Sequence, residues 1–186
     1  MAQYTIEQSR LAHILFSDKR TAWLWLIVRL YLGYEWLMAG WEKVISPAWV
    51  GEKAGAGLTG FLGGALKKTA EFCQPAPAPC HPDVQMWYAW FVENIALPNA
   101  AIFSYMVAYG ELLVGAALIL GFLVGVSAFF GMFMNLNFML AGSVSVNPIW
   151  FTLGLGLLFA WRIAGHIGLD RYALPMVSKY LRRRNT

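Results

Sequence analysis

Long apolar runs separated by shorter polar segments dominate the pattern of this chain. Four runs are each about 20 residues long, the length that a helix needs to cross a bilayer. They cover residues 22–44, 99–120, 122–146 and 148–168. Their apolar residues are nearly continuous and do not alternate with polar ones as in a half-buried strand. The pattern therefore predicts an all-α integral membrane protein, a bundle of four transmembrane helices forming one domain over residues 1–186.

A long loop, residues 45–98, separates the first two runs. Residues 55–72 and 84–95 are predicted to form short helices that lie at the outer membrane interface. The segment CQPAPAPC lies between them, and its prolines favour a stiff, extended chain. The aromatic side chains of residues 84–95 either anchor the loop at the interface or form a lid over a lipophilic substrate, and both interpretations remain open.

Composition and charge support the membrane assignment. The chain is 59% hydrophobic and 13% charged, whereas a soluble domain has about 25% charged residues. The first run is long and lacks a small-residue cleavage site, so it is interpreted as a retained span and not as a cleaved signal peptide. Basic residues gather before the first run and after the last one: Arg10, Lys19, Arg20, Arg171, Lys179, Arg182, Arg183 and Arg184.

This distribution predicts a protein of the cytoplasmic (inner) membrane with both termini in the cytoplasm and the long loop outside. The basic tail has the same explanation, so it is not interpreted as a nucleic-acid site.

Four ionisable residues, Arg29, Glu35, Glu111 and Arg162, interrupt the apolar runs. A charge in hydrocarbon is costly, so it is expected to have a partner or a function. With a helical rise of about 1.5 Å per residue, Arg29, Glu111 and Arg162 all fall roughly 10 Å from the cytoplasmic face. The spacing predicts a buried Arg29–Glu111–Arg162 cluster. Glu35 falls nearer the outer face, at the depth of Asn135.

The charged residues share helix faces with small ones. Arg29, Gly33, Trp36, Gly40 and Lys43 recur at intervals of three or four residues and so lie on one face of the first helix. Small residues beside polar ones are typical of closely packed membrane helices. These residues either hold the bundle together or form a site within it.

These motifs resemble those of the DoxX/DoxD family. The resemblance rests on Arg29-x3-Gly33-x6-Gly40-x2-Lys43 and on Gly110-Glu111-Leu-Leu-x-Gly115, followed by Leu120-Gly121. The loop sequence HPDVQMWYAWF with the following LPNA and FSYMVAYGELLVG is more similar to the DoxD branch, the membrane subunit of thiosulfate:quinone oxidoreductase. The resemblance implies oxidation of thiosulfate to tetrathionate, with quinone as the electron-accepting substrate, and a small partner subunit on another chain.

Quinone reduction takes up two electrons and two protons, which gives the buried charges a chemical use. Glu111 or Glu35 is a candidate proton donor, although Glu111 is equally interpretable as a permanent counter-ion of Arg29. Arg29, Arg162 or Lys43 is a candidate for binding the thiosulfate dianion or the quinone. Trp36 and Asn135 complete the predicted substrate and quinone set.

Cys73 and Cys80 are the two cysteines of the chain, and the predicted topology places them outside, where disulfides persist. The predicted disulfide is either a structural staple of the loop or a redox group that exchanges with thiosulfate and is reoxidised by quinone.

No metal, haem or flavin site is expected. His13, His81 and His166 fall in separate regions, and the chain has no Gly-rich phosphate loop or dinucleotide fingerprint.

Two other functions fit the same residues. One is a non-enzymatic membrane scaffold or small-solute carrier, in which the buried charges serve assembly or translocation. The other is a quinone-coupled thiol oxidase in which Cys73 and Cys80 exchange with protein dithiols. A homo-oligomer is compatible with each.

Overall fold

The computed structural model describes residues 9–72 and 82–176. In these residues the regular structure is helical, apart from an isolated bridge between Thr69 and Val84. The α-helices are α1 (Arg10–Ser17), α2 (Ala22–Val44), α3 (Ala56–Leu66), α4 (Met86–Phe91), α5 (Ala100–Leu120), α6 (Val124–Leu140), α7 (Asn147–Phe159) and α8 (Trp161–Ala164). The short turn η1 (Lys19–Thr21) precedes α2, and the π-helical stretch η2 (Val92–Ala96) continues α4.

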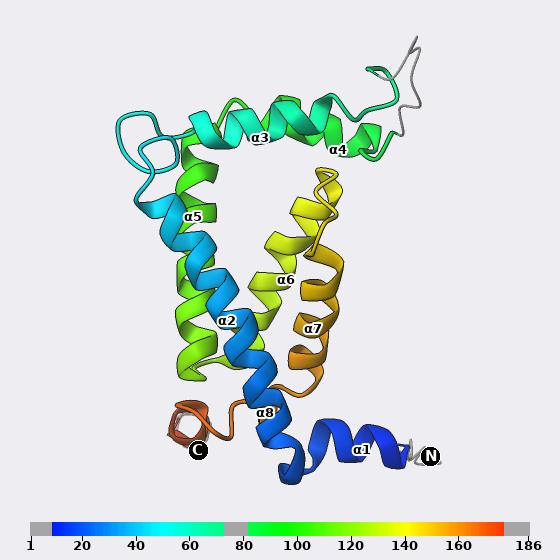
Figure 1. Cartoon of the computed structure of the whole chain (residues 1–186), viewed down its shortest axis with the longest axis vertical. Helices are drawn as coiled ribbons and strands as arrows, with labels where there is room; N and C mark the ends of the chain where they lie inside the picture. The colour runs from blue at the N-terminus through cyan, green and yellow to red at the C-terminus, as the bar shows by residue number, and fades with distance from the viewer. Residues whose placement is uncertain (1–8, 73–81, 177–186) are drawn as a thin grey trace, which may run out of the picture.

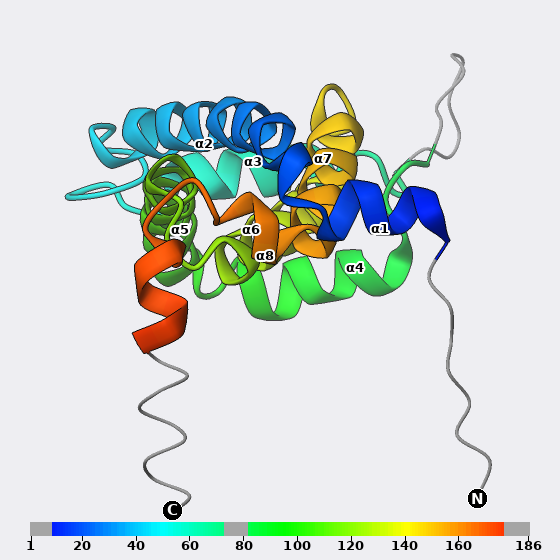
Figure 2. The ribbon, with the colours of Figure 1, turned by 90° about the horizontal axis from the view of Figure 1, so that it is seen from below.

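The long helices stand upright and the short ones close the two ends (Figure 1). α2 lies along α5, and α6 lies along α7. α3 and α4 lie across one end, which we call the roof, while α1 and α8 lie at the other. Figure 2, seen from below, shows α1 and the chain after α8 on that lower face. The all-α prediction is confirmed for the described residues.

Glycines bring α2 and α5 into backbone contact. A Cβ atom on Gly40 would overlap the backbone of Leu112, and one on Gly115 would overlap the backbone of Leu37. Without side chains at these points the two antiparallel helices can approach closely, as small residues allow in membrane bundles. The predicted small-residue face of α2 is therefore a helix-packing surface.

Apolar packing is divided between the bundle and the roof. One cluster of buried residues includes Trp25, Leu32, Trp36, Leu118 and Leu157 and joins α2, α5, α6, α7 and α8. A second joins the roof to the ends of α5 and α6, with Leu58, Leu62, Val84, Tyr88 and Val92 among its members. The two helices expected within residues 45–98 are thus present as α3 and α4, and they have a packed core of their own.

The tight turn between α5 and α6 needs two unusual backbone conformations. Gly121 ends α5 with φ of 67°, a left-handed position that favours glycine. Leu123, with φ of 48°, precedes α6. The free N–H groups at the start of α6 are capped from far along the chain, because Asp170 accepts hydrogen bonds from Leu123 N at 2.6 Å and from Val124 N at 2.9 Å.

The bounds of α2 and α5 agree with the predicted runs, whereas α6 is shorter than its run and the last run is divided between α7 and α8. Length and composition do not qualify all four runs as spans. Within the described residues α5 alone is both long and apolar enough to cross a membrane. α2 has 23 residues but carries four charges, and α6 and α7 have 17 and 13 residues. Those two helices rise roughly 25 and 20 Å, short of a hydrocarbon core of about 30 Å. The four-span bundle therefore remains a prediction.

Candidate functional site

Glu111 is paired with Lys43. The Lys43 Nζ atom lies 2.6 Å from Glu111 Oε2, in an ion pair where Glu111 is 1% exposed and Lys43 is 21% exposed. Lys43 Nζ also lies 5.2 Å from the ring centre of Trp49 in the loop after α2, in cation–π geometry. The pair therefore joins α2, α5 and the beginning of the long loop.

The predicted Arg29–Glu111–Arg162 cluster is wrong, and the register of α2 and α5 explains why. Gly40 lies against Leu112 and Gly33 lies against Ile119, so α5 ends at the level of the middle of α2. The prediction from the sequence assumed that the cytoplasmic ends of α2 and α5 lie at the same depth in the membrane. In the structure the first turns of α2, which carry Arg29, extend beyond the end of α5.

Arg29 is buried in a separate network at the lower end. Its Nη1 donates to Ala164 O at 2.9 Å and its Nη2 donates to Ile167 O at 2.8 Å. The guanidinium thereby satisfies carbonyl groups at and after the end of α8, as basic side chains do at helix C-termini. Gly121 and Gly168 flank it so closely that a Cβ on either would press against Nη1. Asp170 is near enough to interact electrostatically with it.

Arg162 and Glu35 are not part of either network. Arg162 is exposed, with its guanidinium carbon 5.1 Å from the ring centre of Trp161. Glu35 is half-buried on α2 and forms no ion pair within the described residues. The expectation that Glu35 lies with Asn135 is not supported by any contact between them.

Asn135 forms a polar layer with α7 instead. Its Nδ2 donates to Asn147 Oδ1 at 3.1 Å, and Asn147 Nδ2 donates to Ser143 O at 2.6 Å. Asn135 Oδ1 is buried with no hydrogen-bond partner. Asn135 and Trp36 both line a small internal cavity of about 10 Å³ between α2, α5, α6 and α7. The structure thus brings together these two predicted residues, away from the charged ones.

A cleft of about 560 Å³ lies between α5 and α6, beneath the roof. Its walls are almost entirely apolar. The lining residues are Leu58, Phe61, Leu62, Tyr88, Phe91 and Ala96 from the roof, Phe103, Met106, Val107, Gly110, Leu113, Val114 and Ala117 from α5, and Phe122, Leu123, Val126, Ser127, Phe130, Phe133, Met134, Asn137 and Phe138 from the α5–α6 turn and α6. The loop helices therefore cover one end of a lipophilic cleft.

The polar groups of the cleft lie at two separate places. Tyr88 donates its hydroxyl to Asn137 O at 3.0 Å, and Asn137 Oδ1 lies 3.4 Å away. Burial raises the pKa of Tyr88 to about 12, so the hydroxyl stays protonated near neutral pH and remains a donor. We call Tyr88 and Asn137 the polar corner. Ser127, toward the opposite end of α6, donates to Phe122 O at 3.3 Å.

Glu111 is not among the residues that line the cleft. Gly110, Leu113 and Val114 of α5 line it, whereas Glu111 faces Lys43 on α2. The charged pair and the cleft therefore lie on different faces of one helix.

The apolar cleft was not predicted from the sequence, where the aromatic residues 84–95 were interpreted either as interface anchors or as a lid. The sequence signals for the cleft are the phenylalanines of α6 and the aromatic residues of the long loop. Aromatic side chains that only face lipid give the same pattern, so these residues do not by themselves predict a cleft.

Within the described residues, no three His, Cys, Asp or Glu side chains lie close enough together to hold a metal ion. Cys73, Cys80 and His81 lie outside the described residues, so the predicted disulfide has no structural counterpart to compare.

The family model of DoxX matches residues 24–143, well over half of the chain. The chain belongs to the DoxX family. The matched region begins in α2 and ends just after α6, so it includes Arg29, Lys43, Glu111 and every element that lines the cleft. Neither a curated protein nor a solved structure matches this DoxX chain. Family membership supports its membrane character, while the DoxD branch stays a prediction.

Proposed function

We propose that this DoxX protein is a membrane oxidoreductase that binds quinone in the cleft between α5 and α6 and reduces it with electrons from thiosulfate. The observation that carries the proposal is the cleft itself. Its volume of about 560 Å³ lies within the range of small-molecule sites, which are mostly apolar with a few placed polar groups. A quinone fits such a site, because it combines an apolar tail with a ring that carries two polar carbonyl groups.

The outer surface of the helices supports a bilayer setting. Large apolar side chains are exposed along α5 and α6, including Ile102 at 61%, Leu113 at 68% and Phe133 at 56%. Soluble proteins rarely expose such continuous apolar surfaces. We infer that α2, α5, α6 and the pair α7 and α8 cross the membrane, with both termini in the cytoplasm and the roof outside.

The cleft is suited to a ligand that arrives from the lipid phase. Met106, Leu113, Phe130 and Phe133 line it and are themselves exposed, so their outer sides face acyl chains in a bilayer. A quinone enters sideways between α5 and α6. Its carbonyl oxygen accepts a hydrogen bond from the second N–H of the Asn137 amide, whose first N–H donates to Phe133 O at 2.8 Å, or from the Tyr88 hydroxyl once that proton turns away from Asn137 O. Orientation by the polar corner places the ring beneath the roof.

The overall reaction balances without a resident cofactor. Two thiosulfate ions lose two electrons as a sulfur–sulfur bond forms between them, giving tetrathionate, and quinone takes up those electrons with two protons to become quinol. In one route thiosulfate attacks a Cys73–Cys80 disulfide, a second thiosulfate releases tetrathionate from the mixed disulfide, and quinone reoxidises the dithiol. In sequence this cysteine segment connects α3 to α4, both of which line the cleft.

The test is thiosulfate-dependent quinone reduction by the full-length protein in detergent. Decylubiquinone is added with thiosulfate, and loss of quinone absorbance in the ultraviolet is recorded beside direct titration of quinone binding. Binding with reduction supports the proposal. Absence of quinone binding contradicts it and favours the scaffold or carrier function, whereas reduction with a dithiol but not with thiosulfate favours the thiol oxidase. Adding candidate partner subunits tests whether a second chain is needed for the activity. The mass of the protein in solution shows whether it forms a homo-oligomer.

Variants of the polar corner sharpen that test. Tyr88→Phe removes one hydroxyl donor and is expected to weaken quinone binding about 5-fold, the effect of one hydrogen bond. Ser127→Ala, at the other end of the cleft, serves as the matched control and is expected to leave affinity unchanged. Equal effects of both substitutions would contradict the proposed orientation while leaving the cleft as the quinone site.

A further inference from the structure

The lower end of the molecule, remote from the roof, presents exposed basic side chains beside the exposed helix α1. We propose that α1, η1 and the adjoining basic residues bind the headgroups of anionic phospholipids, with α1 lying in the plane of the bilayer surface. This inference is independent of the quinone site.

The helix α1 has two unlike faces and no buried residue. Leu11, Ile14 and Leu15 are exposed at 80%, 51% and 37%. By helical spacing His13 lies on the other side of the helix, and Arg10 borders the apolar stripe next to Ile14. A short amphipathic helix with exposed leucine and isoleucine beside basic residues is the pattern that inserts at the boundary between headgroups and acyl chains.

Contacts at its C-terminal end fix the direction of α1. Phe16 stacks on Trp25 with ring centres 5.8 Å apart and meets the edge of Phe159 at 5.9 Å. Trp25 Nε1 donates to Leu15 O at 2.7 Å, and the Thr21 hydroxyl donates to Ile14 O at 3.0 Å. A helix of eight residues is not stable alone, so these contacts keep it folded across the end of α2.

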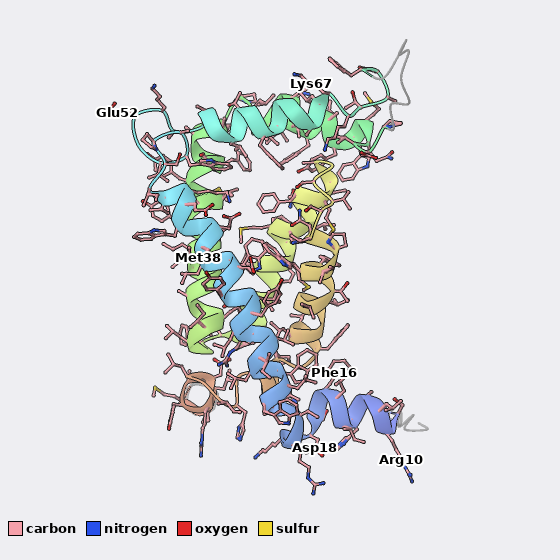
Figure 3. The ribbon with its side chains drawn as sticks, in the orientation of Figure 1. Arg10, Phe16, Asp18, Met38, Glu52 and Lys67 are labelled. Carbon is pink, nitrogen blue, oxygen red and sulfur yellow. The ribbon has the colours of Figure 1, made fainter. Side chains whose placement is uncertain are left out.

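Side-chain directions match a bilayer above and water below. Figure 3 shows Phe16 directed toward the bundle, while Arg10 and Asp18 point away from it. The same view shows α1 extending sideways from the foot of α2, beyond the outline of the long helices. The helix α1 therefore extends over the region beside the bundle, which lipid occupies in a bilayer.

The charge at this end selects an anionic surface. Within the described residues it carries five exposed cations, which are Arg10, Lys19, Arg20, Arg162 and Arg171. Asp170 is buried in the cap of α6, and Asp18 is half-buried and accepts from Arg20 N at 2.9 Å. A second copy of the chain would present the same positive charge, whereas phosphatidylglycerol-like headgroups are complementary.

The opposite end lacks this imbalance. There, among the described residues, Lys53 and Lys67 are exposed beside exposed acids that include Glu52, Glu71, Asp83 and Glu93. This end therefore supplies a matched control.

The experiment measures lipid binding by the full-length protein in neutral detergent, by native mass spectrometry with phosphatidylglycerol and phosphatidylcholine. Wild type is expected to prefer phosphatidylglycerol. Neutralising Arg10 and Lys19 together (R10Q/K19Q) is expected to lower its affinity for phosphatidylglycerol roughly 25-fold, about fivefold per cation. The control K53Q/K67Q removes two cations at the roof and is expected to leave that affinity unchanged. Equal losses in both variants, or no lipid preference in wild type, would overturn the proposal.

Hydrogen exchange tests the placement of α1 separately. In nanodiscs that contain phosphatidylglycerol, the amides of α1 are expected to exchange more slowly than in phosphatidylcholine nanodiscs. The double variant L11S/I14S changes two exposed side chains and is expected to lose this protection while the exchange of α5 stays the same. Protection that persists in L11S/I14S would show that α1 does not insert.

Discussion

At the scale of single residues, the sequence predicts which charged residues are buried but not which groups they bind. Burial of Glu111 and Arg29 follows from their place in apolar runs, and both are 1–2% exposed. Their partners depend on helix register, which Gly40 and Gly115 set through backbone contacts that no count of residues from a membrane face reveals. Asp170 was missed because the groups that it caps lie 46 to 47 residues earlier.

The Lys43–Glu111 pair allows a stability prediction at this scale. Lys43→Met leaves a buried carboxylate unpaired and is expected to destabilise the protein by about 3 kcal/mol. The double variant K43M/E111L removes both charges and should recover most of that loss. Thermal unfolding in detergent measures each variant, with the exposed Lys67→Met as control. Equal instability of the single and double variants would mean that Lys43 contributes packing and not charge compensation.

At the scale of elements, local pattern was sufficient to predict where helices occur. The run predicted at residues 22–44 is helix α2 with the same bounds, and the run at 99–120 is helix α5 from Ala100. The run at 148–168 is interrupted at Ala160 into α7 and α8. The cleft could not be foreseen in this way, because it depends on how far α5 and α6 diverge beneath the roof.

Glycine contacts between α2 and α5 give a prediction at the element scale. Gly40→Ala places a methyl group against the backbone of Leu112, so the helices must separate, at a cost of about 1–3 kcal/mol. Gly60→Ala on α3 is the matched control, because nothing lies within 4 Å of its added Cβ. That control is expected to be neutral or slightly stabilising, since alanine favours helix more than glycine does. The unfolding temperatures of both variants are measured in detergent. Equal unfolding temperatures would show that the contact between α2 and α5 tolerates a side chain.

At the scale of the whole molecule, two pairs of helices meet at the foot and are bridged by the roof, which leaves the apolar cleft between α5 and α6 (Figure 1). The charged pair and the cleft lie on different faces of α5. Stability of the bundle and binding in the cleft are therefore separable properties of the same helix.

Filling the cleft tests that separation. Ala117→Phe adds a ring to the cleft wall and is expected to weaken binding of decylubiquinone at least tenfold by occupying its volume, with little change in unfolding temperature. Ile102→Phe, on the exposed side of the same helix and absent from the lining, is the control. Quinone titration and thermal unfolding are measured together. Unchanged quinone binding in Ala117→Phe would place the ligand elsewhere.

The cap that Asp170 provides for α6 also bears on the order in which the chain can be completed during synthesis. Residue 170 leaves the ribosome only after α2, α5, α6, α7 and α8 have been made. Until then the first N–H groups of α6 lack their carboxylate, and the guanidinium of Arg29 lacks the carbonyls of Ala164 and Ile167. The foot of the bundle is thus its last part to close. A ribosome stalled before this point would hold a chain in which α2 and α5 can already pair while the lower end stays open.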